Sequence, residues 1–296
     1  MLPALFLYVS LVNDVRSLIS RNDLAAAERA ARVYQAQSGQ TPELAAALSW
    51  LARGSLDSRR LDQAESYAAE TRRVADLLLQ TRKLDADRYL PIAVGASIEV
   101  HAQVLAARGE RPEALDFLRR QLALFGPTSL HERIQKNLNL LNLEGKPAPP
   151  LEITEWLGSK PVPLSTLTGH PVLLFFWAHW CGDCKSEVPA LASLQRTYAS
   201  QGLVLVAPTK QYGYVARGEG ATPPVEKKYI EEVWQSYYAP LGNLPVPLSA
   251  TNFLTYGSST TPTIVLIDRA GIVRLYHPGA MPESDLSARI QAILKK

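Results

Sequence analysis

Residues 177–189 read W-A-H-W-C-G-D-C-K-S-E-V-P and hold the two cysteines of the chain, Cys181 and Cys184. The stretch follows V-L-L-F-F at 172–176, a continuous apolar run that predicts a buried central strand. A helix is expected from about Gly182 to Ser200. Two residues between cysteines at the start of a helix bring the sulfurs within disulfide range. The stretch therefore indicates a redox pair, with half of a zinc site or an inert core pair as the alternatives.

A zinc site favours four ligands, and the sequence has no second C-x-x-C to complete one. None of the histidines forms an H-x-x-x-H pair; they are His101, His131, His170, His179 and His277. We therefore expect no metal and no cofactor.

Length and composition bound the rest of the molecule. At ~150 residues per domain, 296 residues predict about two domains. The formal charge of +3 is mild, and no basic block indicates nucleic-acid binding. The apolar start, residues 1–12, is too short to span a bilayer at ~20 residues. It is either a first buried helix or the remnant of a leader or anchor.

Residues 3–142 read as helix almost throughout, rich in Ala, Leu, Arg, Glu and Gln at three- and four-residue spacing. Three stretches, at 22–30, 60–68 and 110–118, each follow a break and open a new helix. Their small residues Ala27, Ala64 and Ala114 are expected where paired helices approach closely. The pattern resembles tetratricopeptide repeats, although the spacing is irregular. We expect about three helical hairpins, with a plain helical bundle as the alternative.

Gly and three prolines in N-L-E-G-K-P-A-P-P at 142–150 cannot continue a helix, so we place domains at 1–142 and 143–296. The second domain has strand candidates, followed by a closing helix at 285–294. The strand candidates lie at 151–153, 162–164, 172–176, 203–207, 263–267 and 272–276. This order describes a mixed sheet with helices on both faces, so the whole chain is α plus α/β.

The lead-in E-G-K-P-A-P at 144–149, the run 161–178 and K-S-E-V-P-A-L at 185–191 resemble the TlpA/ResA-like branch of the thioredoxin fold. That branch comprises thiol-disulfide oxidoreductases that are periplasmic or membrane-anchored. The resemblance implies a location outside the cytoplasm, protein dithiol or disulfide partners and a membrane electron donor. It also implies that Thr261-Pro262, in T-T-P-T at 260–263, is a cis peptide that presents an edge to substrate.

The helix start explains the division of labour between the cysteines. Orphan N–H groups and the helix dipole stabilise a thiolate at Cys181, which is expected to attack. Cys184 is expected to resolve the mixed disulfide. Glu187 is the candidate proton acceptor for Cys184, because Phe175 stands where classical thioredoxins place a buried aspartate. Catalysis is thus assigned to the two cysteines, Glu187 and Pro262.

Residues beside the cysteines are expected to tune or cover them. Trp180 and Thr261 are expected to contact substrate, and Gly182, Asp183 and His179 to tune the redox pair. Asp183 places a negative charge near Cys181, which disfavours the thiolate and predicts a reducing protein. For His179, an exposed position without a role is the favoured interpretation.

An insert at 208–248 departs from the family pattern. It holds a predicted helix from about Val225 to Tyr238 and many tyrosines. Because it follows a central strand, it is expected near the active-site edge of the sheet. Tyr212, Tyr214 and Trp234 are the candidates for a substrate surface, with a plain surface elaboration as the alternative.

Two other functions are weighed against the oxidoreductase. In one, the helical domain recruits a peptide or protein and the second domain is a redox-gated scaffold. The other is a thiol peroxidase, which is disfavoured because residues 174–181 lack the P-x-x-x-T/S-x-x-C loop.

Overall fold

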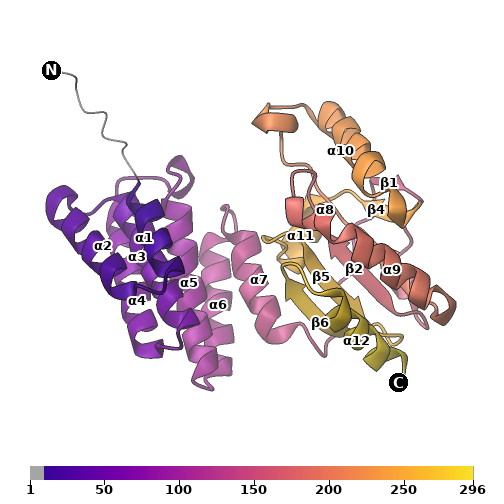
Figure 1. Cartoon of the computed structure of the whole chain (residues 1–296), viewed down its shortest axis with the longest axis horizontal. Coiled ribbons are helices and arrows are strands. Elements are labelled where there is room, and N and C mark those ends of the chain that lie inside the picture. The colour runs from indigo at the N-terminus through magenta and orange to yellow at the C-terminus, as the bar shows by residue number, and fades with distance from the viewer. Residues whose placement is uncertain (1–9, 296) are drawn as a thin grey trace. The chain divides into compact units, whose positions relative to one another are not determined.

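The computed structural model describes residues 10–295. The chain forms two compact units, Met1–Ile134 and Gln135–Lys296 (Figure 1). The expectation for residues 1–12 falls mostly on 1–9, which lie outside the described residues.

The first unit is built of helices that follow one another with short connections. They are α1 (Leu11–Ser20), α2 (Leu24–Ser38), α3 (Pro42–Asp57), α4 (Leu61–Leu79), α5 (Leu90–Ala107), α6 (Arg111–Phe125) and the start of α7 (His131–Asn142), with a 3-10 turn at Leu84–Ala86. Each helix packs on the next through α6, which gives the expected hairpins. The three small residues that were expected at the helix crossings, Ala27, Ala64 and Ala114, are fully buried.

The breaks between paired helices are left-handed residues. Asn22 has φ of 61°, Arg59 has φ of 58° and Gly109 has φ of 86°. Asp23 then caps α2 by accepting the N–H of Ala26 at 2.9 Å. These local signals explain why the three similar stretches each open a helix.

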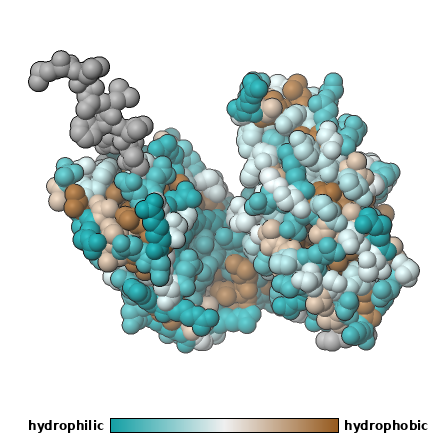
Figure 2. All heavy atoms as spheres, viewed as in Figure 1, coloured by the Kyte–Doolittle hydropathy of each residue, from teal (hydrophilic) through white to brown (hydrophobic). Residues whose placement is uncertain are grey.

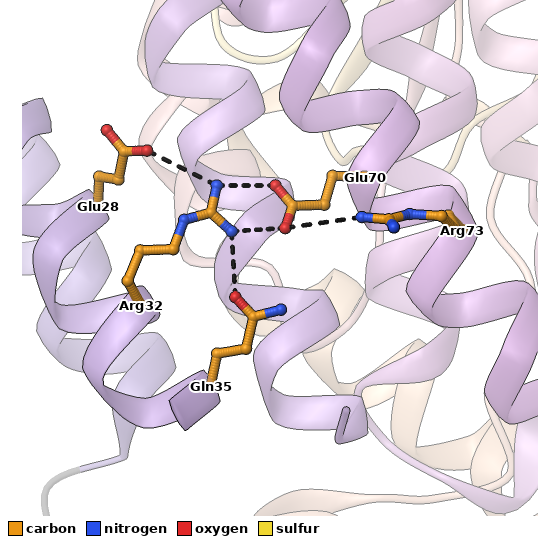
Figure 3. A network of polar contacts seen from close by, with 5 residues as sticks. All are labelled: Glu28, Arg32, Gln35, Glu70 and Arg73. Atoms are coloured by element: carbon orange, nitrogen blue, oxygen red, sulfur yellow. Dashed lines mark hydrogen bonds and ion pairs between the residues drawn. The ribbon is translucent and has the colours of Figure 1, made fainter. Parts of the chain in front are cut away.

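A polar network joins α2 to α4 (Figure 3). The guanidinium of Arg32 donates to both carboxylate oxygens of Glu70, at 2.5 and 2.9 Å. Glu28 lies 3.6 Å from the same guanidinium, and Gln35 accepts from it at 3.1 Å. A bidentate contact of this kind fixes the relative orientation of two helices.

Helix α5 has the length and composition of a membrane span, since it runs for 18 mostly apolar residues from Leu90 to Ala107. It packs against α3, α4 and α6, and more than half of it is buried in this unit. A core helix of a folded domain has the same composition, so α5 is weak evidence for a membrane anchor.

The second unit holds a four-stranded sheet in the order β3-β2-β5-β6. Its strands are β2 (Val172–Phe176), β3 (Val204–Val206), β5 (Thr263–Ile267) and β6 (Val273–Pro278). β2 runs parallel to β3 and antiparallel to β5, and β5 runs antiparallel to β6. The mixed sheet is the one that the sequence predicts.

Alternation along β2 divides the core into two clusters, one on each face of the sheet. Leu173 and Phe175 pack in the cluster that includes α9 (Val188–Tyr198), α10 (Pro223–Tyr237) and α12 (Glu283–Leu294). Leu174 and Phe176 pack in the cluster that includes α11 (Ala250–Tyr256). Helices therefore cover both faces, and β2 is buried along its whole length.

Two strand predictions were wrong. The stretch 151–153 is irregular, and 162–164 leads into a 3-10 turn at Leu164–Leu167. Pro163 lies within the second stretch, and Pro149 and Pro150 come directly before the first. Proline lacks the N–H donor that a sheet would need at these positions. The structure instead places a short strand, β1 (Trp156–Gly158), against β4 (Pro245–Pro247) in a separate two-stranded sheet.

The segment 144–148 lies along the edge strand β6. Gly145 donates its N–H to Val273 O at 2.8 Å, and Ala148 donates to Gly271 O at 2.9 Å. The second unit begins before the boundary expected after residue 142, because the end of α7 belongs to it. Asn139 donates to Thr255 O at 3.3 Å, and Gly257, with φ of 60°, lies against the backbone of Lys136.

Hydrophilic residues cover much of the visible surface, with hydrophobic residues in separate small groups (Figure 2). The exposed large apolar side chains are Val33, Leu77, Leu124, Leu140, Val162, Trp180, Val225 and Tyr237. Trp180 is the one adjacent in sequence to a cysteine, and it is 51% exposed.

Candidate active site

The sheet topology gathers the predicted site at one end. β2 ends at Phe176, and Phe176 pairs with Thr263, the first residue of β5. Thr263 also pairs with Pro278, the last residue of β6. The loop that carries the cysteines, the Thr261-Pro262 peptide and the end of β6 therefore meet at the same edge.

Cys181 and Cys184 form a disulfide at the start of α8 (Gly182–Ser186). Cys181 is the N-cap residue, and its Sγ accepts the backbone N–H of Cys184 at 3.0 Å. Cys184 is fully buried and Cys181 is 3% exposed. An N–H donor directed at Sγ favours negative charge on that sulfur.

The peptide bond between Thr261 and Pro262 is cis. The carbonyl of Pro262 accepts the N–H of Gly279 at 2.7 Å. Among residues 10–295, the backbone N–H and C=O of Thr261 have no hydrogen-bond partner, and its buried hydroxyl has none either. These backbone groups are the kind of edge to which an extended chain can add.

Trp180 and Tyr212 come together beside the disulfide. Their ring centroids are 5.6 Å apart in an edge-to-face arrangement, and Tyr212 is partly buried. Nearby in sequence, Lys185 places its ammonium 4.2 Å from the ring of Tyr237, which is 53% exposed. The aromatic surface therefore has contributions from the cysteine loop and from the insert.

The sequence favoured an exposed position for His179, but the structure buries this side chain, which is 1% exposed. Its Nε2 lies 3.4 Å from Oε1 of Glu226, which is also 1% exposed. The rings of Tyr212, Tyr214 and Tyr229 surround it, all edge-to-face with centroids 5.3 to 5.6 Å away. Burial lowers the pKa of His179, and the charge of Glu226 opposes this shift.

Trp234 does not contribute to an exposed surface. It is 6% exposed and stacks on Tyr238, with ring centroids 4.9 Å apart. Both rings pack against Trp177, whose Nε1 donates to Ala207 O at 3.0 Å. The apolar face of α10 requires such a partner in the core, so Trp234 attaches the insert to the domain and the prediction of substrate contact was wrong.

Glu187 lies at the junction of α8 and α9, three residues after Cys184 and four after Asp183. Burial raises its pKa, and the charge of Asp183 raises it further. The backbone N–H of Met281 and the ring of His277 act in the opposite direction. One buried oxygen, Oε2, has no hydrogen-bond partner within the described chain. Such a carboxyl can take up and release a proton.

Asp183 and Gly182 are both exposed on the first turn of α8. A Cβ at Gly182 would meet no heavy atom within 4 Å. Asp183 and Glu187 are spaced i and i+4, which places two acids on the same helix face. The negative charge of Asp183 therefore interacts with Glu187 as well as with the start of the helix.

Among residues 10–295, no cluster of three or more His, Cys, Asp or Glu side chains is arranged to hold a metal ion. Sequence reasoning missed three residues that pack against predicted site residues, namely Glu226 and Tyr229, both on α10, and Trp177. The visible signal was a predicted amphipathic helix in the insert, but its pairing with His179 depends on contacts distant in sequence.

Comparison with known proteins places this geometry in a family. A family model described as AhpC/TSA family matches residues 145–213. Thiol-disulfide oxidoreductase ResA of Bacillus subtilis strain 168 is 34% identical over 143 residues, which are 48% of this chain and 70% of ResA. Thiol:disulfide interchange protein DsbE of Xylella fastidiosa strain Temecula1 is 30% identical over 154 residues, 51% of this chain and 70% of DsbE.

Solved structures also match about half of the chain. A thiol:disulfide interchange protein of the thioredoxin family from Chlorobium tepidum TLS is 23% identical, with a TM-score of 0.36. The match covers 50% of this chain and 96% of that one. From the fold, the cysteine loop and the identity to ResA together, the chain belongs to the family of thioredoxin-fold thiol-disulfide oxidoreductases that includes ResA.

Proposed function

We propose that the protein exchanges disulfides with protein partners through Cys181 and Cys184. In the reduced protein, the Cys181 thiolate attacks one sulfur of a partner disulfide, and the other partner sulfur leaves as a thiolate. Cys184 then loses its proton and attacks Cys181 Sγ. The second partner thiolate is released, the Cys181–Cys184 disulfide forms, and two electrons have passed to the partner.

The observation that carries this assignment is the position of Cys181 at the N-cap. The N–H of Cys184 at 3.0 Å from Cys181 Sγ would stabilise the thiolate of Cys181 before attack and during its release from the mixed disulfide. Glu187 is proposed as the proton acceptor for Cys184. Its raised pKa and its unpartnered Oε2 support that role.

We infer that the pair runs in the reducing direction. Asp183 is exposed in the first turn of α8, two residues from Cys181. Its negative charge disfavours the Cys181 thiolate in the reduced protein. Because the reduced form is then less stable, the disulfide is harder to reduce. Equilibration with glutathione measures this directly. A potential near ~−120 mV, typical of strong oxidants, contradicts the inference, and one nearer ~−270 mV supports it.

Insulin reduction with dithiothreitol as the electron donor tests the exchange reaction. Wild type should accelerate precipitation of the insulin B chain, and Cys181→Ser should not. Glu232→Gln, an exposed acid on α10, serves as a matched surface control. A Cys181→Ser variant with wild-type activity would assign the reaction to another group. Wild type that is inactive with every dithiol donor would favour the scaffold function.

A pocket in the first unit supports partner recruitment by the helical domain. A cavity of about 200 Å³ lies among α4, α5 and α6. Ala68, Ile98 and Phe117 contribute apolar walls, and Glu65 and His101 face each other across 2.7 Å at its polar side. We propose that it receives an apolar side chain of a partner protein.

Filling this pocket tests recruitment separately from chemistry. Ala69→Phe places a ring at the exposed rim of the pocket. In a Cys184→Ala background, the native partner should be trapped as a mixed disulfide less often after the change, while insulin reduction by the otherwise wild-type Ala69→Phe protein is retained. Equal trapping with and without Ala69→Phe would remove the pocket from the proposal.

We propose that the protein acts outside the cytoplasm, with a membrane dithiol protein as its electron donor. The relationship to ResA supports this location, because disulfides persist in oxidising compartments. Fractionation combined with thiol alkylation in cells tests it. Recovery of the protein in the cytoplasmic fraction would contradict the proposed location.

A further inference from the structure

The insert is attached to the cysteine loop by a buried polar pair. His179 lies two residues before Cys181, and Glu226 lies on α10. Their side chains approach to 3.4 Å, and each is 1% exposed. No other contact between oppositely chargeable groups in residues 10–295 is buried to this degree on both sides.

Glu226 also organises the first turn of the insert. Its carboxylate accepts the backbone N–H of Tyr212 at 2.5 Å and that of Gly213 at 2.8 Å. A buried carboxylate is costly unless donors surround it, so these two N–H groups take the place of water at Glu226. The ring of His179 lies against the same carboxylate, with Nε2 3.4 Å from Oε1. The backbone at 212–213 is thereby held against the same side chain that faces the cysteine loop.

Trp180 is fixed by these contacts on both sides. His179 before it is enclosed by three tyrosine rings, and Cys181 after it is bound in the disulfide. Its exposed ring rests edge-to-face on Tyr212, whose own backbone is bound to Glu226. The position of the exposed tryptophan therefore depends on a pair that does not itself reach the surface.

We propose that His179 and Glu226 are positioning residues, which hold the Trp180–Tyr212 surface beside Cys181 and so determine how well a protein disulfide is accepted. The inference rests on the proposed exchange through Cys181. A protein disulfide reaches the sulfur within an extended chain that must pass over this aromatic surface. A small disulfide needs only the sulfur, so it depends less on the surface.

The test compares reduction of insulin with reduction of oxidised glutathione by the reduced protein. Glu226→Gln keeps the shape but cannot accept both N–H bonds, and His179→Asn removes the ring. Each should lower the ratio of insulin to glutathione kcat/KM about tenfold, the size expected when a buried polar group loses its partner. The loss should appear in KM for insulin rather than in kcat. The double variant should lose no more than either single one, because the two residues act as a unit.

Controls separate this effect from misfolding and from failure of the exchange mechanism. Glu232→Gln, on the same helix but exposed, should keep the wild-type ratio. Trp180→Ala changes an exposed residue and should reproduce the rise in insulin KM even if the buried variants fold poorly. An unchanged ratio in Glu226→Gln, or an unchanged insulin KM in Trp180→Ala, overturns the proposal. If Cys181→Ser retains activity toward both disulfides, the exchange mechanism fails, whatever the ratio.

Discussion

A single acid, Asp183, distinguishes the loop between the cysteines. It is exposed, it carries charge in the first turn of α8, and it lies one turn before Glu187. Because its charge disfavours the Cys181 thiolate, its removal should make the protein less reducing. Asp183→Asn should raise the reduction potential by about 10–20 mV, which corresponds to roughly 0.5–1 kcal/mol for a two-electron couple.

Equilibration with glutathione redox buffers measures this shift. Asp183→Glu keeps the charge and should stay near the wild-type potential. A lower potential in Asp183→Asn would mean that the carboxylate acts mainly by stabilising the helix start, not by opposing the thiolate.

Glu187 makes a second prediction, for the dependence of stability on pH. Its folded-state pKa is raised, chiefly by burial and then by Asp183, so the folded protein favours the protonated carboxyl. That contribution to stability is complete below the unfolded pKa of about 4.5 and is lost as the pH rises through the folded pKa. Oxidised Glu187→Gln should thus gain stability relative to wild type between about pH 4 and about pH 7.

Urea unfolding of both oxidised proteins at the two pH values tests the sign. If Glu187→Gln is stabilised relative to wild type equally at both pH values, the pKa of Glu187 is not raised. The same variant, in reduced form, should slow resolution of the mixed disulfide if Glu187 accepts the proton of Cys184.

Reasoning from single residues had clear limits at this site. The cysteine pair at a helix start could be predicted from spacing, because a helix start after a buried strand is a local pattern. The environment of His179 could not, because its partner Glu226 is 47 positions away (226 − 179). Trp234 was misassigned for the same reason. An aromatic residue on an amphipathic helix gives the same sequence pattern whether its side chain faces the core or a ligand.

At the scale of elements, apolar runs predicted the central strands with almost no shift. Continuous apolar residues at 172–176 and 263–267 match β2 and β5 along their whole length. The short edge elements were harder, because β1 and β4 have three residues each and derive their stability from pairing with each other. α11 was missed although its signals are present: Ser249 caps its start and Gly257 ends it with φ of 60°.

The ion pair between α2 and α4 yields a prediction at this scale. Glu70 has a side chain only 15% exposed, and both of its oxygens bind Arg32. Glu70→Gln should lower the free energy of unfolding by about 1 kcal/mol, near the upper end for exposed pairs, because the contact is bidentate. Asp116→Asn is the comparison, since Asp116 pairs with Arg120 within a single exposed helix face and should cost less than about 0.5 kcal/mol.

Chemical denaturation followed by circular dichroism measures both values. A cost for Asp116→Asn that equals the cost for Glu70→Gln would mean that the bidentate pair adds nothing beyond an ordinary surface contact.

The whole molecule combines a helical unit with a redox unit, and the sequence indicated both. Apolar residues recur at three- and four-residue spacing in the first half of the chain and form continuous runs in the second half, which predicted two domains. The prolines of 144–150 indicated where one domain ends and the next begins. The end of α7 was expected in the helical domain, but it belongs to the second unit. Its bond to Thr255, and the bond of the following segment to β6, join residues more than a hundred positions apart. Local composition marks where a helix stops but not which unit receives its end.

The family model matches residues 145–213, within the second unit, and the helical unit is left with a proposed role. If the helical unit recruits partners, the two units divide recognition and chemistry between them. Ala69→Phe, in the pocket of the helical unit, would then act on recruitment of the partner. Glu226→Gln, in the positioning pair, would act on acceptance of its disulfide at Cys181. Their effects on trapping of the native partner should therefore be additive, as expected for independent sites.

Trapping of a mixed disulfide tests whether Cys181 attacks and Cys184 resolves. Reduced Cys184→Ala protein is mixed with insulin, quenched with acid, and analysed by non-reducing electrophoresis and mass spectrometry. We expect a mixed disulfide between Cys181 and an insulin cysteine, which dithiothreitol releases, and little or none with Cys181→Ala. An adduct that forms through Cys184 in Cys181→Ala as readily as through Cys181 in Cys184→Ala would contradict it.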